Sequence, residues 1–221
     1  MSMAWLREAA AASAQRSAIP AVPPSTAAAA TWSRIDDLGG GLFLCGAAAL
    51  ENRAELERLG IRSILNCATE DLYDRSYSGS SAPLRQKLEG YKVQVFDAQD
   101  VEEQPMTDLW KSGSEFIDSS LQTGGGVAIH CAQGISRSSS TCIAYLMMKE
   151  SMSLDAAFRR VFQARNYIRP NPGFWQQLRD LDKKLGALPP QPSEADEAGL
   201  AMARLDEELS SKKSAMAAGW L

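Results

Sequence analysis

The chain has 221 residues, of which 45% are hydrophobic, and its formal net charge at pH 7 is -4. This length accommodates one domain with a substantial core plus tails, and it is too short for two ordinary domains. The acidic balance argues against a nucleic-acid surface, and no charge-free apolar run approaches the roughly 20 residues that a membrane span needs.

The ends of the chain differ from its middle in composition. Residues 1–32 are rich in Ala, with Ser, Thr and Pro, and contain two arginines against one glutamate. This composition predicts a disordered leader. It is also compatible with an organelle transit peptide, and the sequence leaves that alternative open. Residues 187–221 combine several prolines with an acid-rich run, which predicts a largely disordered tail.

Strand and helix patterns alternate between the two ends. Strands are expected where short apolar segments are bounded by turn residues: residues 33–36, 42–45, 61–67, 91–96 and 127–129, with a glycine turn at 38–41. Helices are expected where apolar residues recur at spacings of three and four: residues 47–59, 106–121, a helix from Thr141, one after Ser153, one from Pro172 to Leu185, and a short one at 84–88 within the long loop 69–90.

Several helix ends have recognisable local signals. Gly60 is suited to follow a helix C-terminus, Ser153 is the expected N-cap of its helix, and Asn171 followed by Pro172 is typical of a helix start. The predicted apolar stripe of the helix after Ser153 consists of Leu154, Ala157, Phe158, Val161 and Phe162. The whole pattern predicts an α/β domain over residues 33–186, with a central, mostly parallel sheet of about five strands and helices on both faces.

The most informative stretch is residues 128–139, which has the pattern of a strand, a loop and a helix. Gly134 permits a backbone conformation that side chains forbid. A loop that opens onto a helix N-terminus points several backbone N–H groups at one spot, which binds a dianionic phosphoryl group and favours a thiolate. The stretch therefore predicts a phosphate-transfer site around Cys131.

The histidine and cysteine inventory restricts the chemistry of this site. His130 is the only histidine, and the four cysteines, Cys45, Cys67, Cys131 and Cys142, are widely spaced. A zinc site is not expected, because structural zinc sites draw on closely spaced ligands. His130 and Cys131 are neighbours in a strand, so their side chains should point to opposite faces and a Cys–His pair is awkward. Activation of Cys131 must then come from backbone dipoles and Arg137.

Five residues separate Cys131 from Arg137. This spacing allows a cradle in which loop N–H groups hold three phosphoryl oxygens while Arg137 donates two parallel hydrogen bonds. The loop dipoles and the helix N-terminus should lower the pKa of Cys131 below the ordinary value of a thiol. The candidate phosphate-binding residues are Ala132, Gln133, Gly134, Ile135, Ser136 and Arg137.

The pattern His130-Cys131-x5-Arg137-Ser138 matches the H-C-x5-R-[ST] signature of the protein tyrosine phosphatase superfamily. More narrowly, residues 131–138 resemble the C-x-x-G-x-S-R-S form of its dual-specificity, MAP-kinase-phosphatase-like branch. Further landmarks of that branch, at residues 42–46, 59–61, 65–66, 116–118, 144–147, 169–174 and 177–178, extend the resemblance over roughly residues 33–186.

The resemblance implies a general acid on the loop after the strand at 91–96, where Asp97 and Asp100 are the two candidates. Laying the following helix onto the family pattern without gaps places the acid at Asp100, with Asp97 as the alternative. By the same resemblance, Ser138 hydrogen-bonds the sulfur and helps it leave in the second step. Cys45 and Cys142 could pair with an oxidised Cys131, although buried inert thiols are the simpler interpretation.

The sequence thus predicts a dual-specificity protein phosphatase that hydrolyses phosphotyrosine, phosphoserine and phosphothreonine through a phosphocysteine, in a shallow cleft, without a metal or organic cofactor. Its expected partners are phosphorylated proteins, with kinases among the candidates, although no Arg/Lys-rich cluster for docking to MAP kinases lies in the N-terminal tail. The cysteine spacing fits a reducing compartment, so the cytoplasm or nucleus is expected.

Two other functions stay open at this point. One is a phosphatase of a non-protein substrate, such as a phosphoglucan or a phosphoinositide, which the absence of a GxGR loop disfavours. The other is a catalytically silent phosphoprotein-binding module, which the presence of Cys131, Arg137 and Asp100 disfavours.

Overall fold

The computed structural model describes residues 33–79 and 82–187. The predicted leader, the possible transit peptide and nearly all of the predicted acidic tail lie outside these residues. The chain divides into two compact units between Leu185 and Gly186. The first unit contains all strands of the described residues and all but the last two residues of their final helix. The expected domain boundaries remain predictions.

Five strands form one sheet in the order β1-β2-β5-β3-β4. All neighbouring pairs are parallel except β1 and β2, which are antiparallel. The prediction of a mostly parallel sheet of about five strands is therefore confirmed. The strands are β1 (Asp36–Gly39), β2 (Leu42–Gly46), β3 (Ile61–Asn66), β4 (Lys92–Val95) and β5 (Gly126–Cys131).

The central position of β5 follows from its composition. Every residue of β2 and β5 is buried, as expected of strands that are covered on both faces. Because β5 lies between β2 and β3, its carboxyl end opens at the middle of the sheet edge, where the loop after Cys131 begins. Binding sites of α/β proteins form at this edge.

The first strand differs from the prediction. The predicted strand at 33–36 was placed too early, because the strand runs from Asp36 to Gly39 and pairs Asp36 with Leu44. Of the turn predicted at 38–41, only the second half is a turn. Gly39, Gly40 and Gly41 all have positive φ, and the reversal to β2 occupies only the last two of them. The predicted turn began at residue 38, whereas pairing with β2 extends the strand ladder through Gly39.

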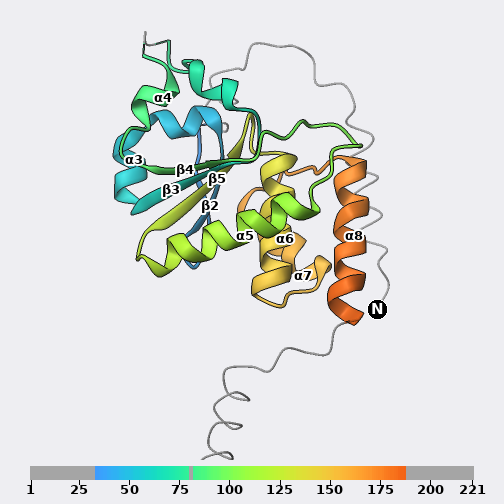
Figure 1. Cartoon of the computed structure of the whole chain (residues 1–221). Coiled ribbons are helices and arrows are strands. Elements are labelled where there is room, and N and C mark those ends of the chain that lie inside the picture. Colours follow the sequence, from blue (N-terminus) through green and yellow to red (C-terminus); the bar gives the residue numbers. More distant parts are fainter. Residues whose placement is uncertain (1–32, 80–81, 188–221) are drawn as a thin grey trace, which may run out of the picture. The chain divides into compact units, whose positions relative to one another are not determined.

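The helices are η1 (Ala47–Glu51), α3 (Arg53–Arg58), η2 (Glu70–Asp74), α4 (Leu84–Lys87), α5 (Thr107–Gln122), α6 (Arg137–Lys149), α7 (Leu154–Ala164) and α8 (Pro172–Ala187). Figure 1 shows α5, α6, α7 and α8 gathered on one face of the sheet, with α3 on the other. The predicted caps are present, since Ser153 accepts a hydrogen bond from the backbone of Ala156 and Asn171 accepts one from that of Phe174.

Two predicted helices needed correction. The single helix expected at 47–59 is divided into η1 and α3 at Asn52, whose side chain accepts a hydrogen bond from the Glu55 N–H and so begins a new helix. Helix α6 begins at Arg137, four residues before Thr141. Its first turn is polar yet buried, because the hydroxyls of Ser140 and Thr141 donate back to the carbonyl of Arg137.

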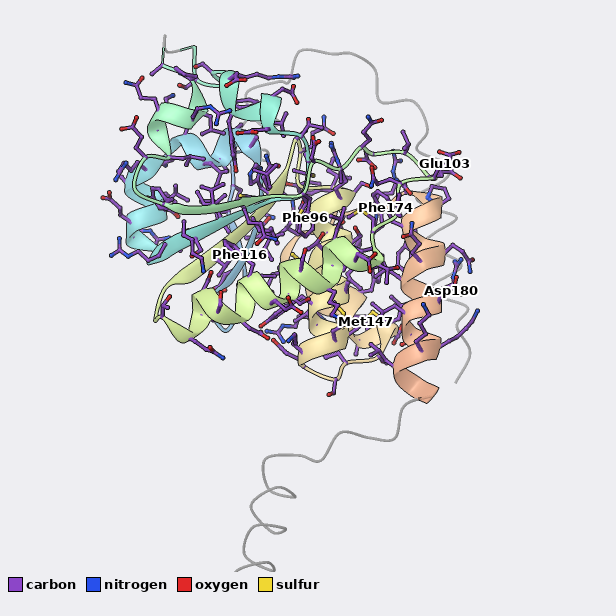
Figure 2. All side chains as sticks on the ribbon, viewed as in Figure 1. Phe96, Glu103, Phe116, Met147, Phe174 and Asp180 are labelled. Carbon is purple, nitrogen blue, oxygen red and sulfur yellow. The ribbon has the colours of Figure 1, made fainter. Side chains whose placement is uncertain are left out.

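The core packs between the sheet and the helices. Phe96, Phe116 and Met147, labelled in Figure 2, are buried there, and the ring of Phe96 lies against Gly113 of α5. The expected burial of Phe162 was wrong, because its side chain is 39% exposed and stacks on Phe158 at the rim of the helix face.

Candidate active site

The loop after Cys131 occupies residues 132–136, between the end of β5 and the start of α6. Gly134 has a φ of +72°, and a Cβ atom at this position would lie 2.5 Å from the carbonyl oxygen of Cys45. Both the backbone conformation and the close approach of β2 therefore require glycine.

The carbonyl groups of this loop are bound from outside. The acceptors and donors are Ala132 O with Ala47 N (3.1 Å), Gln133 O with Arg165 Nη2 (2.9 Å), Gly134 O with Arg165 Nε (2.9 Å), and Ile135 O with Arg169 N (2.8 Å). With the carbonyls held outward, N–H groups are left facing the concave side, where the Gly134 N–H donates to the Sγ of Cys131 across 3.2 Å. The loop is a preorganised set of donors for an anion.

Arg165 is the functional residue that the sequence analysis missed. Its side chain is completely buried, binds two loop carbonyls through one guanidinium, and pairs with Asp36 at 2.6 Å. The planar fork of arginine suits this role, since it can donate in several directions at once. Nothing in the local sequence indicated this role. Arg165 directly follows an amphipathic helix, and its partners lie about 30 and 129 residues away in the sequence.

Cys131 is buried, with 2% of its surface exposed, and its sulfur accepts hydrogen bonds on more than one side. Burial alone would raise the pKa of its thiol. Four interactions lower the pKa by more than burial raises it. They are the hydrogen bond from the Ser138 hydroxyl at 3.2 Å, the charge of Arg137, and the backbone N–H groups of Ser138 and Ile135. The net result is a pKa below the ordinary 9.0, which favours the nucleophilic thiolate.

The guanidinium of Arg137 is held at one end only. Its Nη1 donates to the carbonyl of Ala98 across 3.1 Å, and its Nε is buried with no acceptor within hydrogen-bonding distance among the described residues. A buried donor of this kind needs a partner. A phosphoryl group bound in the cradle would supply one, in the two-point geometry that arginine favours.

Asp100 lies at the same mouth. Its Oδ1 accepts hydrogen bonds from the Ser136 hydroxyl at 2.7 Å and from the Asn171 side chain at 3.0 Å. Its Oδ2 lies 3.6 Å from Nε of Arg137, close enough for an ion pair but too long for a hydrogen bond. The structure therefore brings Asp100, Arg137, Ser138 and Cys131 to one site, and adds Ser136 and Asn171 as residues that hold Asp100 in place.

This combination of loop, thiol, guanidinium and carboxylate has counterparts among known proteins. Residues 42–184 match the family model described as dual specificity phosphatase, catalytic domain. The chain belongs to the dual-specificity phosphatase family. The sequence-based identification of the family and of a dual-specificity protein phosphatase is thus confirmed.

Individual relatives of this phosphatase agree with the family match. Human dual specificity protein phosphatase 13B is 36% identical over 166 residues, which cover 72% of this chain and 77% of the relative. Dual specificity protein phosphatase 1B of Arabidopsis thaliana is 30% identical over 151 residues, covering 68% and 83%. The crystal structure of human DUSP28 matches with a TM-score of 0.58 at 28% identity, covering 75% of this chain and 98% of the other.

In this phosphatase, Asp97 lies apart from the hydrogen-bonded group around Cys131. It has a φ of 56°, its side chain is exposed, and its backbone N–H donates to the carbonyl of Ala68. Among the described residues its carboxylate has no hydrogen bond or ion pair, whereas that of Asp100 has both. The geometry thus favours Asp100 over Asp97 as the carboxylate of the site.

His130 is not a base for Cys131 in this phosphatase. Its Nε2 lies 3.0 Å from the Tyr73 hydroxyl and its Nδ1 lies 3.2 Å from the carbonyl of Cys131, so both ring nitrogens are engaged away from the sulfur. Burial lowers the pKa of His130 from 6.5 to about 4. The imidazole is therefore neutral at physiological pH and has a structural role.

The other three cysteines differ from Cys131 in their electrostatics. Cys45, Cys67 and Cys142 are free thiols that are completely buried. Burial raises the pKa of all three, in the case of Cys45 to about 12. In the described part of the chain, no cluster of three or more His, Cys, Asp or Glu side chains could hold a metal, and no helix there is long and apolar enough to cross a membrane.

Proposed function

We propose that this phosphatase hydrolyses phosphotyrosine, phosphoserine and phosphothreonine in proteins through a phosphocysteine formed on Cys131. The observation that carries the proposal is the position of the Cys131 sulfur, which receives hydrogen bonds from Gly134 N–H and the Ser138 hydroxyl at 3.2 Å each. A thiolate stabilised in this way lies at the floor of a loop in which the carbonyls of residues 132–135 are bound by groups outside the loop.

In the first step the Cys131 thiolate attacks phosphorus in line with the ester oxygen, forming an S–P bond as the P–O bond breaks. Arg137 and the N–H groups of residues 132–137 stabilise the equatorial phosphoryl oxygens. Asp100 gives its proton to the departing tyrosine, serine or threonine oxygen. Because Oδ1 of Asp100 already accepts two hydrogen bonds, we assign the proton to Oδ2.

In the second step a water molecule attacks phosphorus and the S–P bond breaks. The Asp100 carboxylate takes the proton of this water, and inorganic phosphate leaves. The hydroxyl of Ser138 stabilises the sulfur as it regains its negative charge. The two steps together consume one water molecule for each phosphate ester, and Asp100 returns to its protonated form.

The substrates in this proposal are phosphorylated proteins, and phosphorylated kinases belong to that class. The family membership supports the substrate class, and nothing in the described residues selects one kinase. Four free thiols in the described part of the chain support a reducing compartment, and we place the enzyme in the cytoplasm or nucleus.

Phosphate release from phosphotyrosine and phosphothreonine peptides tests the proposal. Cys131→Ser should abolish turnover, and Asp100→Asn should lower kcat by ~10²-fold or more, the scale of general acid catalysis. Asp97→Asn is the matched control and should change kcat little. A larger loss for Asp97→Asn would move the acid to that residue.

The same assay separates the two alternatives. Exclusive turnover of a phosphoglucan or a phosphoinositide would contradict a protein substrate. Binding of phosphopeptides without release of phosphate, unchanged by Cys131→Ser, would instead indicate a phosphoprotein-binding module.

A further inference from the structure

The loop that contains Asp100, residues 97–106, lies against the N-terminal end of α8. Figure 2 shows Glu103 of this loop beside the first turn of the helix, close to Phe174. The contact is tightest at Gly173, where a Cβ atom would lie 1.9 Å from the carbonyl oxygen of Glu102 and 2.6 Å from its Cα. Only a residue without a side chain allows the loop backbone to approach the helix this closely.

The side chain of Gln177, one turn further along α8, fastens the end of the same loop. Its Oε1 accepts a hydrogen bond from the Met106 N–H at 2.7 Å, and its Nε2 donates to the carbonyl of Gln104 at 2.9 Å. Gln104 in turn accepts a hydrogen bond from the Gln99 N–H through its own side chain at 3.0 Å. The two glutamines close the loop on either side of Asp100.

The helix itself cannot yield easily at this contact. Phe174 and Leu178 are completely buried in the core, which fixes the position of the first two turns of α8. A group added at Gly173 must therefore displace the loop rather than the helix. Asn171, the N-cap of α8, completes the contact through its hydrogen bond to the Asp100 carboxylate.

We propose that Gly173 and Gln177 are positioning residues that hold the Asp100 loop against α8 in the geometry for proton transfer, before any substrate binds. This inference rests on the proposed role of Asp100 as the general acid. It adds that the correct placement of the acid depends on a helix that begins 72 residues after it in the sequence.

Leaving-group dependence tests the proposal, because a misplaced acid harms the departure of a basic oxygen more than that of an acidic one. We would measure kcat and kcat/KM with phenyl phosphate, a poor leaving group, and para-nitrophenyl phosphate, a good one. Gly173→Ala should lower kcat for phenyl phosphate by ~10-fold to 10²-fold, the scale of a displacement of about 1 Å, with a much smaller loss for para-nitrophenyl phosphate.

Matched controls lie on the same helix. Gly186→Ala adds the same methyl group where no atom of the described residues lies within 4 Å, and should leave both rates unchanged. Gln177→Ala should reproduce the leaving-group pattern of Gly173→Ala. Gln176→Ala removes an exposed neighbour whose hydrogen bonds within the described residues go to Arg179 and Asp180 of the same helix, and should not change the rates.

Combination with Asp100→Asn decides whether these residues act through the acid. If they do, adding Gly173→Ala or Gln177→Ala to Asp100→Asn should cause little further loss. Equal losses on both substrates, or losses that add to that of Asp100→Asn, would overturn the positioning role. If Asp100→Asn alone lacked the leaving-group dependence, the acid assignment would fail instead, and this inference with it.

Discussion

The hydroxyl of Ser138 lies 3.2 Å from the Sγ of Cys131 and donates a hydrogen bond to it. This contact is possible because α6 begins at Arg137, so that its first turn rises directly over the sulfur. Ser138 is completely buried, and the hydrogen bond to Cys131 satisfies its donor in the described structure. The same hydrogen bond therefore lowers the pKa of the Cys131 thiol and stabilises the thiolate as it departs from phosphorus in the second step.

Ser138→Ala should therefore slow the breakdown of the phosphocysteine more than its formation. Without the hydroxyl the departing thiolate loses a donor, and a charge-assisted hydrogen bond is worth ~1.5–3 kcal/mol, or roughly 10-fold to 10²-fold in rate. Rapid-quench kinetics should then show a burst of phenol release followed by a slow steady state. A variant that lost burst and steady state in equal proportion would contradict this role.

The lowered pKa of Cys131 should be visible in alkylation kinetics. The thiolate is the reactive form, so iodoacetamide should inactivate the enzyme at pH values below the ordinary thiol pKa of 9.0. Ser138→Ala should shift the midpoint of this reaction to higher pH. Alkylation, measured as an increase in protein mass, should disappear in Cys131→Ser, because the other three thiols are buried and burial raises their pKa values. Inactivation that began only near pH 9.0 would refute the electrostatic argument.

Arg165→Lys should preserve a positive charge beside Asp36 while losing the fork that binds the carbonyls of Gln133 and Gly134. Without these hydrogen bonds the loop peptides could rotate, and their N–H groups would no longer point to the concave side of the loop. We expect a fall in kcat and in affinity for vanadate, an analogue of the transferred phosphoryl group, by ~10-fold or more, the lower end for loss of oriented donors.

The matched control for this variant is Arg34→Lys. Arg34 also pairs with Asp36, but the Arg34 side chain is 52% exposed, so water screens its charge more than that of the buried Arg165. Equal effects of the two substitutions on vanadate binding would show that Arg165 serves only the ion pair.

The buried His130 should make stability depend on pH. Its pKa is about 4 in the folded protein against 6.5 ordinarily, so between these pH values the unfolded chain binds a proton that the folded protein does not. The free energy of unfolding should fall as the pH is lowered through this window, by on the order of 3 kcal/mol in total. Above pH 6.5 the neutral His130 no longer lowers the stability. Urea unfolding at pH 7 and pH 5 measures the slope, which should be flatter in His130→Gln.

The fold was predictable from the sequence where the signal was local. Cys131, Gly134 and Arg137 lie within seven residues, and their spacing alone predicted a phosphate-binding loop between a strand and a helix. The caps at Ser153 and Asn171 were equally local. By contrast, the division of the first helix at Asn52 was missed. The apolar periodicity continues through this residue, but its backbone leaves the helical conformation and its side chain caps the next helix.

What the sequence by itself determined was the cradle, since a chain of this length between Cys131 and Arg137 has few ways to point its N–H groups inward. What only the tertiary structure decided was the support around it. Arg165 meets the loop from 31 residues away, and Asn171 meets Asp100 from 71 residues away. Single polar contacts between residues so far apart produce no repeating pattern of apolar and polar residues in the sequence. They form only when the sheet and α8 bring the segments together.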